Sequence, residues 1–238
     1  MATPSGGGRS TGKGVWRLPP GTRHPAVEQP GGPRRKGRSM KRRLVIAAHA
    51  DDETIGCGGT ISKYAEAGAD IFVGVLTRDA SDEQHQVRRE EAEAAWSTLG
   101  VAGSDWAMMR SHPLTVAESS VDAVVGWLET FRPDLVFVPH PGEEDPDHAV
   151  VSRVVASAML RSGHFRRVLG YEVWTPILRP ALFEDVTDVM QKKIEAIQCF
   201  TTQMQERDYA SGAAGLNRFR GVTTGNGRFV EAFTLVQM

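Results

Sequence analysis

The most informative segment of this 238-residue chain is Leu44-Val45-Ile46-Ala47-Ala48-His49-Ala50-Asp51-Asp52-Glu53-Thr54. An apolar run typical of a buried strand continues directly into a histidine and three consecutive acidic residues. His49 and Asp52 stand three positions apart, so one tight turn can direct an imidazole nitrogen and a carboxylate to the same point. Such a pair suits a divalent transition metal, zinc first. Asp51 then points elsewhere and is free to act on water at the metal. The alternative is an ordinary solvated acidic loop.

A second segment, about a hundred residues further along, repeats this arrangement. Residues 134–139 form another nearly all-apolar run, and residues 140–148 follow it with histidines and carboxylates before a helical pattern begins. His148 lies at the head of that helix and can supply a third ligand beside His49 and Asp52. Three protein ligands with an open fourth position are typical of a catalytic zinc site, because a structural zinc site is closed by four.

These two segments resemble the signatures of the PIG-L/LmbE-like zinc-dependent deacetylases, which remove acetyl groups from N-acetylglucosamine-type sugars. The resemblance covers roughly residues 41–205. It is carried by Ala48-His49-Ala50-Asp51-Asp52-Glu53 and Pro146-Asp147-His148, with further similarity at Arg88-Arg89-Glu90-Glu91-Ala92, Leu99-Gly100-Val101 and Thr202-Gln203. The resemblance implies Zn²⁺ held by His49, Asp52 and His148, and it implies Asp51 as the general base.

Two positions depart from the family pattern. Ala50 replaces a proline, which removes no functional group. Asp145 replaces the first histidine of a His-Pro-Asp-His signature. In the family members that have this histidine, the resemblance implies that it stabilises the oxyanion or protonates the leaving amine. Asp145 cannot do the first as a carboxylate, although it could do the second in its acid form. His140 or a group of the substrate could also fill the role, so both Asp145 and His140 are candidate substrate contacts and the general acid stays open.

Other features of the sequence allow two readings each. Arg78 and Asp79 follow the second predicted strand, where they either bind substrate hydroxyls or pair with each other. Gly56-Cys57-Gly58-Gly59 could cradle a phosphate, but the dinucleotide spacing is incomplete, so close packing of a helix on the sheet is favoured. Cys57 and Cys199 are too few for a disulfide framework, and we expect buried free thiols in a reducing compartment.

Charge divides the chain into two parts. Residues 1–40 are rich in Gly, Pro, Ser and Arg and carry eight basic residues against one acid, so residues 41–238 retain 20 basic and 28 acidic side chains, a net charge of −8. We expect a disordered basic leader over residues 1–40 and one deacetylase domain over residues 41–238. An acidic body disfavours nucleic acid and favours neutral or cationic ligands, unless the surplus serves solubility alone. A nucleic-acid-binding leader is less favoured, since no aromatic residues interleave its basic ones.

Alternating strand and helix patterns predict an α/β fold. After the first strand, further strands are expected at residues 70–77, 105–109, 134–139 and 168–173, and helices at 54–68, 84–99, 118–131, 147–161 and 186–200. Repeated β-α units imply right-handed crossovers and a Rossmann-like parallel sheet in the order 3-2-1-4-5, with helices on both faces. Both metal-binding segments then follow neighbouring strands, at the crevice where such sheets bind ligands. Residues 212–227 either line the substrate mouth or form a plain surface loop.

Together these features predict a zinc-dependent hydrolase that removes an acetyl group from a small N-acetyl amino sugar. The acidic body and the Ala, Arg, Gly and Val content favour an aminoglycoside intermediate such as N-acetylparomamine as substrate. The alternatives are a thiol-cofactor pseudodisaccharide of the mycothiol or bacillithiol type, a non-catalytic nucleotide-binding module, or an inactive family member that acts as a scaffold. Residues 1–40 contain no apolar signal-peptide core and no later run is long enough to span a membrane, so we expect a cytoplasmic protein without a membrane partner.

Overall fold

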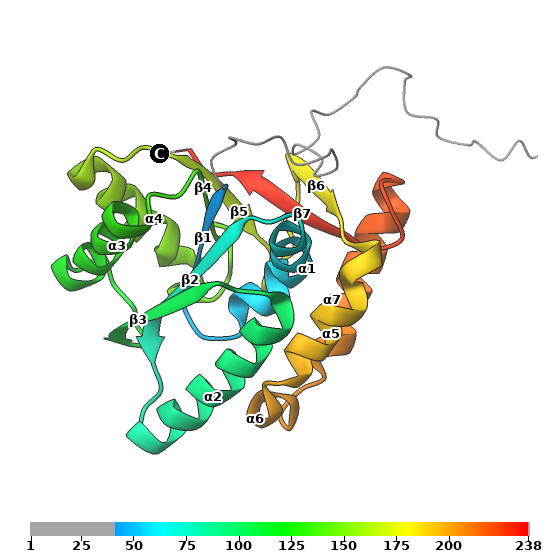
Figure 1. Cartoon of the computed structure of the whole chain (residues 1–238), viewed down its shortest axis with the longest axis horizontal. Coiled ribbons are helices and arrows are strands. Elements are labelled where there is room, and N and C mark those ends of the chain that lie inside the picture. The colour runs from blue at the N-terminus through cyan, green and yellow to red at the C-terminus, as the bar shows by residue number, and fades with distance from the viewer. Residues whose placement is uncertain (1–40, 238) are drawn as a thin grey trace, which may run out of the picture.

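A seven-stranded sheet lies at the centre of the part of the molecule that the structure describes (Figure 1). The computed structural model describes residues 41–237, and the predicted basic leader at residues 1–40 lies outside them. The strands are β1 (Arg42–Ala47), β2 (Asp70–Arg78), β3 (Gly103–Arg110), β4 (Leu135–Pro139), β5 (Arg167–Tyr171), β6 (Leu182–Asp185) and β7 (Val230–Leu235). Their order is β3-β2-β1-β4-β5-β7-β6, which confirms the predicted 3-2-1-4-5 core of the sheet.

The direction of the strands changes at one edge of the sheet. β1 to β5 pair in parallel, as predicted. β7 pairs antiparallel with both β5 and β6. The predicted parallel sheet is therefore confirmed for its five strands, and the two antiparallel strands at this edge were not recognised in the sequence.

Helices cover both faces of the sheet (Figure 1). α3 (Glu118–Phe131) and α4 (Pro146–Ser162) pack together on one face, and α1 (Asp52–Glu66), α2 (Asp82–Leu99), α5 (Met190–Gln198) and α7 (Tyr209–Thr224) cover the other. The short helices η1 (Thr187–Val189) and α6 (Thr201–Met204) flank α5. Within the described residues, no helix has the length and apolarity needed to cross a membrane.

The residues of β1 explain how the strand comes to be covered on both sides. Leu44 and Ile46 are buried in the hydrophobic cluster that includes α3 and α4, whereas Val45 is buried in the cluster that includes α1 and α2. Because both faces of the strand are buried, its sequence is a continuous apolar run. Val45 pairs with Phe137 of β4, so the two strands that lead into the predicted metal-binding segments are direct neighbours and end at the same edge.

The glycines after β1 serve close packing, as the sequence favoured. A Cβ atom on Gly56 would overlap the ring of Tyr171, and one on Gly59 would lie 2.7 Å from Cβ of Val186. These contacts leave no room for a phosphate on that side of α1. Cys57 is buried in the same helix as a free thiol, while Cys199 is free and only half-buried.

Of the two alternatives for residues 212–227, the plain surface loop is wrong, and the lining of the substrate mouth stays a prediction. Most of these residues belong to α7, whose glycines lower helix propensity and hid the helix in the sequence. Gly221 is needed for packing, since a Cβ atom there would overlap the carbonyl oxygen of Arg228 as the chain turns back toward β7. The first turn of α7 contributes Tyr209 to the cavity described below.

Candidate active site

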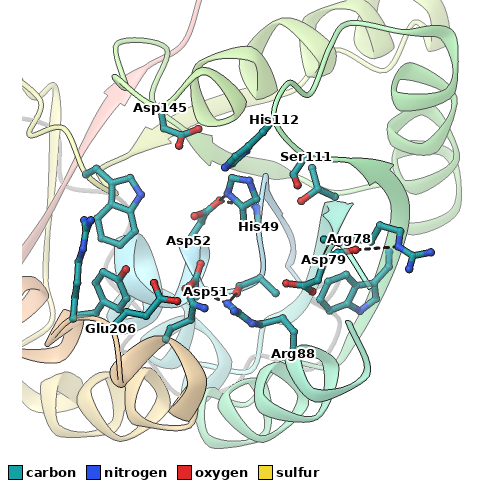
Figure 2. Close-up of a pocket in the computed structure, with 18 residues that line it drawn as sticks. His49, Asp51, Asp52, Arg78, Asp79, Arg88, Ser111, His112, Asp145 and Glu206 are labelled. Carbon is teal, nitrogen blue, oxygen red and sulfur yellow. Dashed lines mark hydrogen bonds and ion pairs between the residues drawn. The ribbon is translucent and has the colours of Figure 1, made fainter. Parts of the chain in front are cut away.

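A cavity of about 520 Å³ opens at the carboxyl ends of the parallel strands (Figure 2). Its walls come from the turn after β1, the end of β2, the loop after β3, the segment before α4 and the α6–α7 junction. The lining residues are His49, Ala50, Asp51, Asp52, Thr77, Arg78, Asp79, Ala80, Arg88, Trp106, Ser111, His112, Asp145, Trp174, Gln203, Glu206, Arg207 and Tyr209. The cavity therefore lies where the order of the sheet predicts a ligand site.

His49, Asp52 and His148 converge beside this cavity. Nδ1 of His49 lies 3.3 Å from Nε2 of His148 and 3.8 Å from Oδ2 of Asp52. Nε2 of His148 lies 3.0 Å from Oδ1 of Asp52. In a tetrahedral zinc site with metal–ligand bonds of 2.0–2.1 Å, the ligand atoms lie about 3.3 Å apart. The three groups thus have the mutual spacing of a metal-binding set.

The electrostatics of this set also fit a cation. Oδ1 of Asp52 is buried and accepts no well-directed hydrogen bond within the described residues, although a ring nitrogen of His148 faces it. Burial lowers the pKa of His148, but the charge of Asp52 outweighs it and raises the pKa to about 11. The protein thus favours a positive charge at this point. Two imidazoles and one carboxylate are a donor set that suits zinc, and also iron.

Asp147 holds the His49 ring in place. Its Oδ2 lies 3.1 Å from Nε2 of His49, which leaves Nδ1 of that ring facing the other two ligands. Asp147 also accepts the backbone N–H of Leu114 at 2.7 Å and that of His112 at 2.9 Å. Burial raises the pKa of Asp147, but the hydrogen bonds from these groups outweigh it and lower the pKa. A carboxylate behind a ligating histidine fixes its tautomer and orientation.

Asp51 points into the cavity from the amino end of α1. Its backbone has φ 142°, a strained conformation for a residue other than glycine, and such strain costs on the order of 1–3 kcal/mol. Burial, followed by the charge of Asp52, raises the pKa of Asp51 well above its usual range. Nη1 of Arg88 lies 3.4 Å from Oδ2 of Asp51, as the dashed line in Figure 2 shows. This buried carboxylate can therefore accept a proton within the cavity.

Arg88 is itself held by Glu91. Nε of Arg88 lies 3.6 Å from Oε2 of Glu91, one turn along α2. Glu91 accepts hydrogen bonds from the hydroxyl of Thr201 and from the backbone and hydroxyl of Thr202, at 2.7–2.8 Å. These contacts give two of the three further similarities of sequence, those at residues 88–92 and 202–203, a shared structural role, because they join α2 to α6 at the wall of the cavity. Arg88 was not predicted as a site residue.

Three of the four candidate substrate contacts line the cavity, and the fourth, His140, does not. Arg78, Asp79 and Asp145 line the cavity. The guanidinium of Arg78 pairs with the carboxylate of Asp82, and its Nε donates to the backbone carbonyl of Asp79 at 3.2 Å. The carboxylate of Asp79 lies 3.4 Å from His85 instead.

His140 does not line the cavity. Its Nε2 lies 2.6 Å from the carbonyl oxygen of Thr175, and its Nδ1 accepts the backbone N–H of Gly142. Substrate binding by the other three residues stays a prediction.

Aromatic side chains form a further wall of the cavity, and the sequence analysis did not predict it. Trp174 stacks against Tyr209 with ring centroids 4.9 Å apart, and both line the main cavity together with Trp106. On the other side of Trp174 and Tyr209 lies a second cavity of about 380 Å³, which also shares Arg207 with the first. Trp174 follows β5 and Tyr209 begins α7, at places without a local sequence pattern. They become neighbours only in the fold.

Comparison with known sequences supports the assignment of family. Residues 44–159 match the family model "PIG-L: GlcNAc-PI de-N-acetylase". A 1D-myo-inositol 2-acetamido-2-deoxy-alpha-D-glucopyranoside deacetylase from Rhodococcus erythropolis is 31% identical over 157 residues, which are 51% of this chain and 53% of the relative. The chain thus spans about half the length of this curated relative.

Comparison with solved structures supports the fold and shows that the fold alone does not decide the chemistry. An N,N'-diacetylchitobiose deacetylase from Pyrococcus horikoshii is 26% identical with a TM-score of 0.70, covering 82% of this chain and 83% of that one. The 4-carboxy-2-hydroxymuconate hydratase GalB from Pseudomonas putida KT2440 is 24% identical, also with a TM-score of 0.70, covering 84% of this chain and 97% of its own. The sequence motifs, the fold and the family match agree, and residues 44–159 are similar to the PIG-L (GlcNAc-PI de-N-acetylase) family.

Proposed function

We propose that this chain is a metal-dependent N-deacetylase that hydrolyses the acetamide of an N-acetylglucosamine-type unit in a small glycoconjugate. The observation that carries the proposal is the convergence of His49, Asp52 and His148 at one point, with the strained and buried Asp51 beside them at the same cavity. The names of the Rhodococcus and Pyrococcus relatives support this reaction over the hydration performed by GalB.

The residues of the site divide the work of amide hydrolysis. Zn²⁺ would be held by His49, Asp52 and His148, and when bound it would polarise the amide carbonyl and acidify water. Asp51 takes the proton of the attacking water, since its buried carboxylate has a raised pKa and lies at the cavity. Arg88 orients Asp51, and Asp147 orients the ring of His49.

For the substrate, we propose a neutral pseudodisaccharide in which N-acetylglucosamine is joined to inositol. The named activity of the Rhodococcus relative supports this choice over an aminoglycoside intermediate such as N-acetylparomamine. A cavity of about 520 Å³ lies within the usual size range for small-molecule sites. The aminoglycoside reading rests on net charge and composition, so it is our second candidate.

The nucleotide-binding alternative has less support. The glycines that would have to cradle a phosphate pack against Tyr171 and Val186 instead. The scaffold alternative rests on Asp145 in place of a histidine, and the other residues of the two motifs are present.

Metal analysis combined with acetate release tests the proposal. We expect one zinc ion per purified chain, and acetate release from an N-acetylglucosaminyl-inositol substrate that exceeds release from N-acetylparomamine. N,N'-diacetylchitobiose serves as a further N-acetyl sugar in the panel. Bound metal without acetate release from any member would contradict the deacetylase proposal, and nucleotide binding without metal would favour the binding module.

A further inference from the structure

We propose that His112, in the loop after β3, is a further catalytic residue of this site and gives the departing amine its proton from Nε2. This inference rests on the proposed deacetylase function. Amide hydrolysis needs such a donor, because an amine anion is a poor leaving group, and general acids of this kind typically contribute about 10²–10⁴-fold to the rate. Neither the motifs nor the family match names this residue.

The contacts of His112 hold its ring at the cavity in one orientation. Its Nδ1 lies 3.0 Å from Oδ2 of Asp147, and its backbone N–H donates to the same oxygen at 2.9 Å. Its φ of 53° lies in the left-handed region, which histidine adopts more readily than most residues other than glycine. With Nδ1 turned toward Asp147, Nε2 is left without a hydrogen-bond partner among the described residues.

The position of His112 suits a donor opposite the base. Its ring meets the ring of His49 edge-on, with centroids 5.4 Å apart. Figure 2 shows Asp51 on one side of His49 and Asp52, and His112 on the other side. An amide bound between them would have its attacking water near Asp51 and its leaving nitrogen near His112. The side chain is 70% exposed, so a substrate can reach it.

The candidates named from the sequence are less suited to this task. Oδ1 of Asp145 already accepts the backbone N–H groups of Asp147 and His148 as the N-cap of α4. His140 points away, toward the carbonyl oxygen of Thr175. Of the histidines that line the cavity in the described residues, His49 faces the other metal-binding groups, which leaves His112.

The proton balance of the step is closed. The oxygen of water forms a bond to the carbonyl carbon and gives one proton to Asp51. The C–N bond then breaks, its electron pair stays on nitrogen, and the nitrogen takes a proton from Nε2 of His112. The products are the free amine and acetic acid, which keeps the second proton of the water and releases it to solvent to become acetate. Proton exchange of Asp51 and His112 with solvent restores both groups for the next turnover.

The experiment compares His112→Ala with His164→Ala in the zinc-loaded protein, using an N-acetylglucosaminyl substrate with and without added imidazole. His164 is the matched control, since it follows the carboxyl end of α4, whereas His148 lies at the amino end, and it does not line the cavity. We expect His112→Ala to keep stoichiometric zinc and a near-normal KM, and to lose about 10²–10⁴-fold in kcat. His164→Ala should keep the turnover of the parent. Added imidazole can occupy the space of the missing ring, so it should restore part of the kcat that His112→Ala loses.

Three outcomes would overturn the inference. Loss of zinc from His112→Ala would make His112 a ligand, together with His49 and Asp147, which lie within reach of it. A kcat within about threefold of the parent would remove it from the chemistry. A kcat of His112→Ala that does not rise with added imidazole would assign His112 a structural role in its loop. The parent enzyme separates this inference from the proposed function, because absence of acetate release there would contradict the function itself.

Discussion

Asp52 uses its two carboxylate oxygens for different purposes. Oδ2 accepts the backbone N–H of His49 at 2.8 Å, which fixes the carboxylate in the turn, while Oδ1 faces the ring of His148. Asp52→Ala should therefore leave far less than one metal ion per chain and abolish turnover. Elemental analysis of the purified variant checks this, with Glu93→Ala on the exposed side of α2 as a control. Full metal occupancy in Asp52→Ala would remove Asp52 from the metal-binding set.

Asp51 should behave differently from its neighbour. It lies outside the metal-binding set and contacts Arg88, so Asp51→Asn should keep its zinc. Because the amide cannot accept the proton of water, kcat should fall by about 10²–10⁴-fold, as for the loss of a general base. Single-turnover acetate release and zinc analysis on the same sample give both answers. A zinc-free variant would show that Asp51 is a ligand and that the two roles are reversed.

The site residues that could be predicted from the sequence are marked by short, local patterns, whereas those that were missed are not. His49 and Asp52 lie in one turn, so their spacing alone predicts convergence. His148 could be added because both segments follow apolar strands that end at one edge. His112 and Trp174 carry no such signal, since their roles depend on where the loops after β3 and β5 lie in the folded chain. The orientation of the His49 ring likewise depends on its contact with Asp147, which is far away in the sequence.

At the level of elements, burial and periodicity explain which parts of the fold could be predicted. Strands β1, β2, β4 and β5 are largely apolar runs, and the predicted bounds of the first five strands lie close to the observed ones. β6 has only four residues, and β7 carries Glu231 and Thr234 among its apolar residues. Neither sequence therefore resembles that of a buried parallel strand. α7 contains several glycines, which lower helix propensity, so the sequence did not predict it as a helix.

A buried ion pair joins the missed elements to the predicted ones. Lys193 of α5 and Glu231 of β7 are both fully buried, with Nζ 2.6 Å from Oε1. Glu231 also accepts the backbone N–H groups of Gly59 and Thr60 in α1, at 2.9 and 2.8 Å. Glu231 thus satisfies backbone donors of α1, while Lys193 balances its charge. This pair holds the helix that begins at the metal-binding turn.

Removing only Lys193 should destabilise the protein strongly. Lys193→Met leaves the carboxylate of Glu231 buried without its counter-charge, which typically costs about 3–5 kcal/mol of the free energy of unfolding. The double variant K193M/E231Q should recover part of this loss, since it removes the charge as well. Urea unfolding of the zinc-loaded protein measures both. Arg89→Met is the matched control, because Arg89 and Glu93 are exposed and such pairs contribute about 0–1 kcal/mol. Equal effects of Lys193→Met and Arg89→Met would contradict a structural role for the buried pair.

At the scale of the whole molecule, the net charge of −8 over residues 41–238 separates the two substrate candidates. Long-range attraction acts on a cationic aminoglycoside intermediate and leaves a neutral inositol pseudodisaccharide unaffected. The charged side chains that line the cavity include the three arginines Arg78, Arg88 and Arg207 among the acids, so the cavity itself is mixed in sign. A neutral substrate fits such a lining without a gain from the overall charge.

The salt dependence of kcat/KM should therefore differ between the two substrates. For N-acetylparomamine, kcat/KM should fall as ionic strength rises, because the screening length shortens from about 10 Å at 0.1 M to about 3 Å at 1 M. For the neutral N-acetylglucosaminyl-inositol substrate it should change little, which controls for salt effects on the metal site. Deleting residues 1–39, which carry all eight basic residues of the predicted leader, should preserve this contrast or strengthen it. Parallel salt responses would show that the acidic surplus has no part in substrate choice, and the aminoglycoside candidate would then lose the charge argument that supports it.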